Sequence, residues 1–169
     1  MKALTGLLVT LRTATAADVD ALVAIRATPE VHERWRGIDL RAEVLDALTD
    51  DELHLMVVED AAGTVIGGIQ WAAETDPDYA HASVDMFVDP AMHGQGFGTD
   101  AARTLCRYLL NTIGFHRLTI DPAADNVAAI RCYEKVGFRR VGVMRAYERG
   151  LDGSWHDGLL MDLLAEDLV

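Results

Sequence analysis

The pattern of apolar and polar residues is clearest in the middle of the chain. Residues 82–88 alternate as a strand does, with Val84 and Met86 on one side and Asp85 on the other. A glycine-rich turn follows at 93–99, and after it apolar residues recur at the i, i+3, i+4, i+7 spacing of one helix face. These apolar positions are Ala102, Leu105, Cys106, Leu109, Leu110 and Ile113. The middle of the chain is therefore predicted to fold as a strand, a tight turn and a helix.

The segments on either side of this centre predict a mixed α/β fold. Strands are predicted at 8–11, 53–59, 64–71, 117–120, from Phe138 onward and at about 159–164. Helices are predicted from Thr15 to about Ala27, at 41–48, and from a cap at Asp125 or Asn126 to Gly137. The first helix is predicted to end at Pro29. Because no linker, repeat or low-complexity tract interrupts the sequence, residues 1–169 are predicted to form one domain.

The alternating glycines Gly94, Gly96 and Gly98 indicate an anion site. A turn of this kind at the start of a helix directs unpaired backbone N–H groups and the positive end of the helix dipole at one point, which favours a phosphate. The spacing is neither that of the dinucleotide-binding G-x-G-x-x-G motif nor that of a P-loop, which needs a following Gly-Lys-Ser/Thr. On this turn alone, a flexible loop before a well-started helix is an open alternative.

Composition and charge narrow the classes of function. Fifteen basic against 27 acidic residues give a net charge of −12. A surface of that sign repels nucleic acid and anionic lipid and attracts a cationic partner, although solubility alone could explain it. Cys106 and Cys132 both fall in predicted helices, which argues against a disulfide framework and for the reducing cytoplasm. The six histidines lack metal-ligand spacing, so no metal site is predicted.

A second motif lies at 126–138, where the sequence reads N-x-x-A-x-x-x-Y-x-K-x-G-F. Together with the turn at 93–99, it resembles the GNAT superfamily of acetyl-CoA-dependent N-acetyltransferases. This chain has His93 where the family usually has Gln or Arg at the start of the turn. The resemblance covers most of the chain. It implies a mixed, mostly antiparallel sheet flanked by about four helices, whose central parallel strands, 82–88 and 117–120, splay apart to admit the cofactor.

The resemblance also implies where acetyl-CoA binds. The amides from about Gln95 to Thr99 would hold the pyrophosphate, and a cationic imidazole at His93 would favour it further. The strand end would pair with the pantetheine arm as an added strand would, and Asn126 would bond that arm from the other side. The implied cofactor-binding set is Phe87, Val88, His93, Gly94, Gln95, Gly96, Phe97, Gly98, Thr99, Asn126, Ala129 and Tyr133.

Acyl transfer to an amine needs a base for the amine and an acid for the departing thiolate. The resemblance gives the acid role to Tyr133, and the alternative is a packing tyrosine bonded to backbone. Asp85 is a candidate base, acting directly or through water, and an anchor for an ammonium group. The alternative for Asp85 is a structural ion pair. Cys132 has no obvious histidine partner, so it is interpreted as a small buried residue and transfer as direct.

Among GNAT enzymes, the stretches 120–126 and 129–135 are most similar to the aminoglycoside 6'-N-acetyltransferases. A polycationic sugar needs several carboxylates and a flat apolar surface. The candidate acceptor-binding residues are Trp35, Glu74, Asp85 and Asp121. For Trp35 the alternative is a core or lid aromatic, and for Asp121 it is the turn at Pro122. A protein or peptide N-terminal, polyamine or siderophore-lysine acetyltransferase, or a sensor without turnover, stays open, as does the choice between monomer and homodimer.

Overall fold

The structure, a computed structural model, describes residues 2–169, which form eight strands and five α-helices. The strands are β1 (Leu4–Thr5), β2 (Thr10–Thr13), β3 (Leu53–Glu59), β4 (Val65–Glu74), β5 (His81–Val88), β6 (Arg117–Ile120), β7 (Arg139–Arg149) and β8 (Trp155–Leu164). The helices are α1 (Val19–Arg26), α2 (Pro29–His32), α3 (Leu40–Thr49), α4 (Phe97–Tyr108) and α5 (Val127–Glu134). A π-helical turn, Leu109–Ile113, continues α4.

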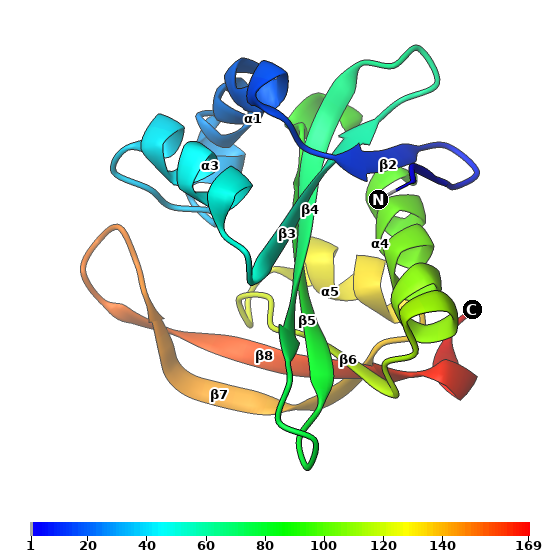
Figure 1. The fold of residues 1–169 in the computed structure, drawn as a ribbon. Coiled ribbons are helices and arrows are strands. Elements are labelled where there is room, and N and C mark those ends of the chain that lie inside the picture. The colour runs from blue at the N-terminus through cyan, green and yellow to red at the C-terminus, as the bar shows by residue number, and fades with distance from the viewer. Residues whose placement is uncertain (1) are drawn as a thin grey trace.

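All of these strands join one sheet in the order β1-β2-β3-β4-β5-β6-β8-β7. Neighbouring strands are antiparallel except β5 and β6, whose parallel pairing is limited to Ala82 with Leu118 and Ser83 with Thr119. In Figure 1, β3, β4 and β5 stand upright whereas β7 and β8 run almost across them. The predicted mixed, mostly antiparallel sheet with a central parallel pair is therefore confirmed.

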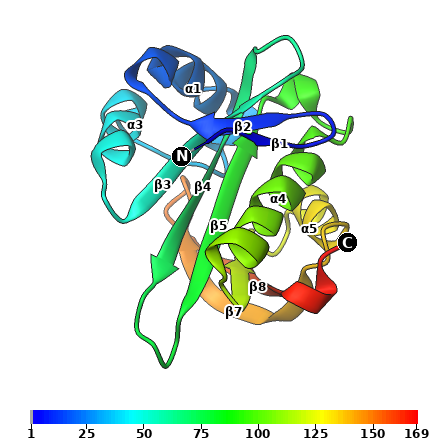
Figure 2. The ribbon, with the colours of Figure 1, turned by 45° about the vertical axis from the view of Figure 1, so that its right-hand side comes forward.

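Helices pack on both faces of the upright half of the sheet (Figure 2). On one face, the apolar side of α4, with Leu105 and Cys106 fully buried, packs against Val84 and Met86 of β5. On the other face, α1 and α3 enclose a smaller cluster that contains Phe87. The predicted alternation along β5 is thus confirmed. Among residues 2–169, no helix has the length and apolar character needed to cross a lipid bilayer.

The limits of several elements differ from those predicted. The strand expected at 8–11 lies at Thr10–Thr13, where it forms a hairpin with the unpredicted β1. Pro29 does follow α1, but it is also the first residue of α2, a position where its missing N–H costs nothing. The last strand begins at Trp155 rather than near 159. It was missed there because β7 and the first residues of β8 are exposed on both faces, so no apolar alternation marks them.

Candidate functional site

Strands β5 and β6 separate just beyond their short parallel contact. Their last paired residues are Ser83 and Thr119, whereas β4 stays paired with β5 as far as Val88. From 84 to 88, the edge of β5 that faces β6 therefore has no strand partner within residues 2–169. Such an edge offers main-chain groups to which an extended chain can add as a further strand. The predicted splaying of the central strands is confirmed, and it creates a wedge between β5 and β6.

The glycine-rich turn leaves a row of unpaired main-chain N–H groups at the start of α4. Within residues 2–169, the amides from Gly94 to Thr99 have no protein acceptor, and the first helical bond runs from the Asp100 N–H to the Gly96 carbonyl at 3.0 Å. Gly94 and Gly96 have φ values of 74° and 92°, in the left-handed region that residues with a side chain avoid. Unpaired amides at a helix N-terminus favour an anion, so this turn can hold a phosphate group.

The side chains of the turn brace its backbone. His93 Nε2 lies 2.9 Å from the Val88 carbonyl oxygen, so this nitrogen carries the proton and donates it. Gln95 Nε2 donates to the carbonyl oxygen of Ala91 at 2.9 Å. The His93 ring nitrogen that makes this bond is therefore committed to the end of β5 rather than to an anion. Among the described residues, the groups of the turn that are left without a protein partner include the main-chain amides, which could bind an anion.

The start of α5 forms the wall opposite the turn. The Asn126 side-chain oxygen accepts a hydrogen bond from the Ala129 N–H at 3.2 Å, which caps the helix. The Asn126 amide nitrogen has no protein partner within residues 2–169, so it can still donate to a ligand. Thr99 Oγ1 lies 3.3 Å from the Cys132 sulfur and joins the turn to α5. Burial raises the pKa of the Cys132 thiol, which opposes a role as nucleophile.

Tyr133 is buried on α5, with its ring edge-on to Phe138 at a centroid distance of 6.0 Å. Its hydroxyl group forms no hydrogen bond within the described part of the chain, and it is not sealed from solvent. The alternative of a tyrosine bonded to backbone is therefore not what the structure contains. Burial raises the pKa of Tyr133 well above its ordinary value, and the Asp85 charge raises it further. Tyr133 thus carries a proton at neutral pH, and the Asp85 charge acts on it.

Asp85 lies in the wall of a cavity of about 200 Å³ on the face opposite α4. The cavity leaves the carboxylate accessible to solvent, and Oδ1 accepts a hydrogen bond from the Met86 N–H at 2.8 Å. Although Asp85 is open to the cavity, the protein packed around it disfavours the charged carboxylate and raises the pKa of Asp85 to about 7, and the charges of Asp121 and Glu148 add to this rise. Within residues 2–169, no basic side chain forms an ion pair with Asp85. An unpaired carboxylate with a pKa near neutrality is suited to accept a proton.

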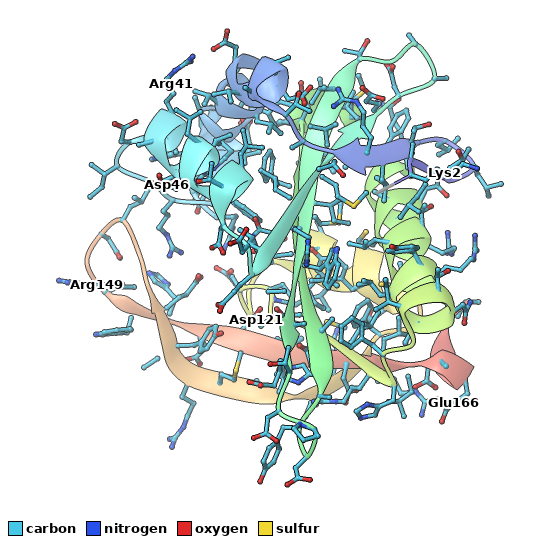
Figure 3. The ribbon with its side chains drawn as sticks, in the orientation of Figure 1. Lys2, Arg41, Asp46, Asp121, Arg149 and Glu166 are labelled. Carbon is cyan, nitrogen blue, oxygen red and sulfur yellow. The ribbon has the colours of Figure 1, made fainter. Side chains whose placement is uncertain are left out.

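Asp121 follows the end of β6 and lines the same cavity as Asp85. Figure 3 shows it between the upright strands and the β7–β8 hairpin. The hydroxyl group of Tyr147, on β7, donates a hydrogen bond to Asp121. Neither Tyr147 nor Glu148 was singled out from the sequence, because no periodicity or motif marks this part of β7. The structure therefore brings together the two predicted carboxylates and adds two residues from the hairpin.

The other two predicted acceptor residues differ in their placement. Trp35 is partly buried, with its ring edge-on to Phe87 at 4.8 Å and the Arg26 guanidinium 5.6 Å from the ring centroid. The Trp35 side chain also lowers the pKa of Asp85, but Trp35 is not among the residues that line the cavity. Glu74 does not line the cavity. It is the last residue of β4, and its carboxylate accepts a hydrogen bond from the Asp76 N–H at 2.9 Å.

A second cavity, of about 240 Å³, lies between the segment after α2 and the β7–β8 hairpin. Two ion pairs border it: Arg34 with Asp125 at 2.6 Å and Arg36 with Glu148 at 3.0 Å. Glu148 relates the two cavities, because it lines this one and its charge acts on Asp85 in the other. Because Arg34 and Arg36 pair with two of the carboxylates that line it, this second cavity carries charges of both signs.

Comparisons with known proteins agree with this geometry. The sequence model of the acetyltransferase (GNAT) domain family matches residues 9–139. The aminoglycoside N(6')-acetyltransferase type 1 of Klebsiella pneumoniae is 28% identical over 155 residues, which cover 80% of this chain and 76% of that protein. A structure of AAC(6')-Ib with paromomycin and acetyl-CoA is 26% identical with a TM-score of 0.77, covering 95% of each chain. Mycobacterium smegmatis RimJ in complex with CoA-disulfide shares the fold, with a TM-score of 0.84 at 22% identity, covering 99% of this chain and 89% of RimJ.

Proposed function

The chain belongs to the GNAT family of acetyltransferases, and we propose that it transfers an acetyl group to the primary 6'-amine of an aminoglycoside. It is an acyltransferase that uses acetyl-CoA. One observation carries the proposal: Asp85 and Asp121 share one cavity, and the charges of both act on the buried Tyr133. A relative that matches most of the chain is an aminoglycoside N(6')-acetyltransferase, which supports this choice of acceptor.

The wedge and the turn fit acetyl-CoA. The amides from Gly94 to Thr99 would bind the pyrophosphate, because they have no partner in the protein. The free edge of β5, through Phe87 and Val88, would pair with the pantetheine arm, and the Asn126 amide nitrogen would bond that arm from α5. Bound there, acetyl-CoA supplies the thioester carbon that the amine attacks.

Asp85 and Tyr133 would divide the proton transfers between them. Asp85 would take the proton of the amine, directly or through water, because a carboxylate with a pKa of about 7 is a competent base at neutral pH. Tyr133, whose raised pKa keeps it protonated, would give its proton to the departing sulfur of CoA. Cys132 stays a thiol because burial raises its pKa, so the acetyl group would pass directly to the amine.

The acceptor cavity favours a ligand with several positive charges. Asp85 and Asp121 would each bind an amino group. Trp35 would give an apolar surface beside them for a sugar ring. Opposite charges of this kind speed encounter and select against neutral acceptors.

Release of CoA from acetyl-CoA tests this proposal. The wild-type enzyme is assayed with tobramycin, with spermidine, with a lysine derivative and with a peptide that has a free N-terminus. We expect the highest kcat/KM with tobramycin, at a Michaelis constant in the micromolar range, roughly 1 µM to 1 mM. Transfer to the peptide, spermidine or the lysine derivative without transfer to tobramycin would keep the acetyltransferase but refute the aminoglycoside acceptor.

A glycine substitution separates the turn from the rest of the site. Gly96→Ala forces a side chain into a left-handed conformation, with φ at 92°, and would turn the neighbouring amides away from the pyrophosphate. We expect the KM for acetyl-CoA to rise about tenfold, the effect of losing about one hydrogen bond to a charged group, while the KM for the amine is unchanged. Gly114→Ala is the matched control, because Gly114 has a φ of 94° but lies outside the turn. Equal effects of both variants on the acetyl-CoA KM would contradict the assignment.

A further inference from the structure

We propose that Tyr147 is a positioning residue that aims the Asp121 carboxylate into the acceptor cavity, and so sets a preference for acceptors with a second ammonium group. The inference deepens the proposed function and rests on it, because it takes that cavity as the amine site. Tyr147 itself does not line the cavity. It would act through Asp121, which does.

The contact joins two distant parts of the chain. The hydroxyl group of Tyr147, on β7, donates to Oδ2 of Asp121, which follows β6, at a sequence separation of 26 residues. Because this bond occupies Oδ2, the rotamer of the carboxylate is fixed and Oδ1 is left to face a ligand. The two groups belong to different elements, so the bond exists only when the hairpin is folded against the end of β6.

An irregularity in β7 gives Tyr147 its direction. The pairing of β7 with β8 shifts register once between Arg140 and Gly142, continues to Met144 opposite Gly158, and resumes at Glu148 opposite His156. Three residues of β7 therefore span the stretch that Asp157 alone spans on β8. In this bulge Ala146 has a φ of 49°, and its N–H donates to Asp157 Oδ1 at 2.8 Å. A left-handed conformation in a non-glycine residue is uncommon and is often found near functional sites.

The same few residues of β8 hold the loop that carries Asp121. The Leu159 N–H donates to the Pro122 carbonyl at 2.8 Å, and the Ala124 N–H donates to the Asp157 carbonyl at 2.9 Å. Gly158 leaves room for the tyrosine, because a Cβ on Gly158 would lie 2.7 Å from the Tyr147 ring. One segment of β8 thus sets the positions of both partners. This arrangement is what a preformed binding group requires.

Tyr147 is poorly placed for a role in the hydrophobic core. The residue is 48% exposed and belongs to neither hydrophobic cluster. Its bond to the carboxylate is the first cause that raises the pKa of Tyr147 to about 12, so the hydroxyl donates across the neutral pH range. Loss of the hydroxyl should therefore leave folding intact and free the carboxylate to rotate.

Kinetics of Tyr147→Phe, Asp121→Asn and the double variant test the proposal. The acceptors are tobramycin and the pair 1,5-diaminopentane and pentylamine, which differ by one ammonium group. For an acceptor that is not turned over, Kd is measured by calorimetry in the presence of CoA. We expect both single variants to raise KM or Kd for tobramycin and the diamine about tenfold, the effect of one hydrogen bond to a charged group. For Tyr147→Phe, which keeps the Asp121 charge, we expect kcat within about twofold of the wild type and no change for pentylamine, because Tyr147 affects only binding of the second ammonium.

The double variant distinguishes action through Asp121 from a separate role. If Tyr147 acts through Asp121, the double variant is no worse than Asp121→Asn, since neighbouring residues of one unit are not additive. Tyr79→Phe, in the exposed loop after β4, is the control and should match the wild type. Unchanged KM in Tyr147→Phe, equal losses for the diamine and pentylamine, or additive losses in the double variant would each refute the proposal. Transfer to the diamine but not to tobramycin would refute the aminoglycoside acceptor alone, and the diamine comparison would still decide the role of Tyr147.

Discussion

Asp85→Asn is expected to lower kcat/KM for the amine by about 10²–10⁴-fold, the usual contribution of a general base. The amide has the same shape as the carboxylate but cannot accept the proton of the amine. Because Asn keeps an oxygen for the Met86 N–H, the hydrogen bond at 2.8 Å can persist and the fold should be unaffected. The KM for acetyl-CoA should stay the same, since the turn is untouched. Asp78→Asn, in the exposed loop after β4, is the control: it also removes one negative charge, and it should leave kcat/KM unchanged.

The pH dependence of this loss identifies the group. A base must be unprotonated to act, so the wild-type kcat/KM should rise with pH up to about 7, where Asp85 titrates, and this part of the rise should be absent in Asp85→Asn. The stability of the wild-type fold should change in the opposite direction to its activity and fall as pH rises. A carboxyl group with a raised pKa binds its proton more tightly in the folded state, so it destabilises the fold as pH rises from about 4, its unfolded value, to about 7.

Melting temperatures therefore supply an independent check. We expect Asp85→Asn to melt above the wild type at pH 8 and to approach it at about pH 3, below both pKa values, where the wild-type carboxyl is mostly protonated in both states. If activity is lost but the two proteins have equal melting temperatures at both pH values, the pKa of Asp85 is not raised in the folded protein. Retention of full activity in the variant would remove Asp85 from the chemistry and leave the amine to lose its proton to water.

The parts of the fold that sequence reasoning located are those whose periodicity arises from burial. Residues 82–88 alternate because Val84 and Met86 face one hydrophobic cluster and Phe87 the other. The helix after the turn is recognisable because one face, with Leu105 and Leu109, is fully buried. The turn is marked by glycines because its backbone conformation requires them. Where a strand or helix buries one face, its apolar residues recur with a regular period, and the element can be predicted from the sequence.

Both strands of the β7–β8 hairpin were predicted, but the start of β8 and the bulge of β7 were not, because no regular packing acts on that end. Strand β7 is exposed on both faces, so its residues follow no period. The bond from Tyr147 to Asp121 depends on a bulge at Ala146, a residue that gives no local signal for a left-handed conformation. Strand β4 runs three residues further than predicted, so Glu74 is its last residue and does not line the cavity. Contacts between elements that are far apart in sequence had to come from the fold.

Tyr133→Phe is expected to lower kcat by about a hundredfold, a moderate value for loss of a general acid. The departing sulfur would then leave as a thiolate and take its proton from water. The ring itself should stay in place, since Phe keeps the edge-on contact with Phe138 at 6.0 Å. Because the hydroxyl forms no hydrogen bond within residues 2–169, its removal breaks no protein contact, and the free energy of unfolding should change by less than about 1 kcal/mol.

The control for Tyr133→Phe is a second tyrosine that packs without a proposed chemical role. Tyr108, at the end of α4, is partly buried against the same hydrophobic cluster, so Tyr108→Phe should leave kcat unchanged. Single-turnover measurements would separate the chemical step from CoA release, because an acid acts only on the former. A lower melting temperature with unchanged kcat would make Tyr133 a packing residue. The wedge would then hold the thioester in place while water protonated the leaving group, and Asp85 alone would carry the acid–base chemistry of this site.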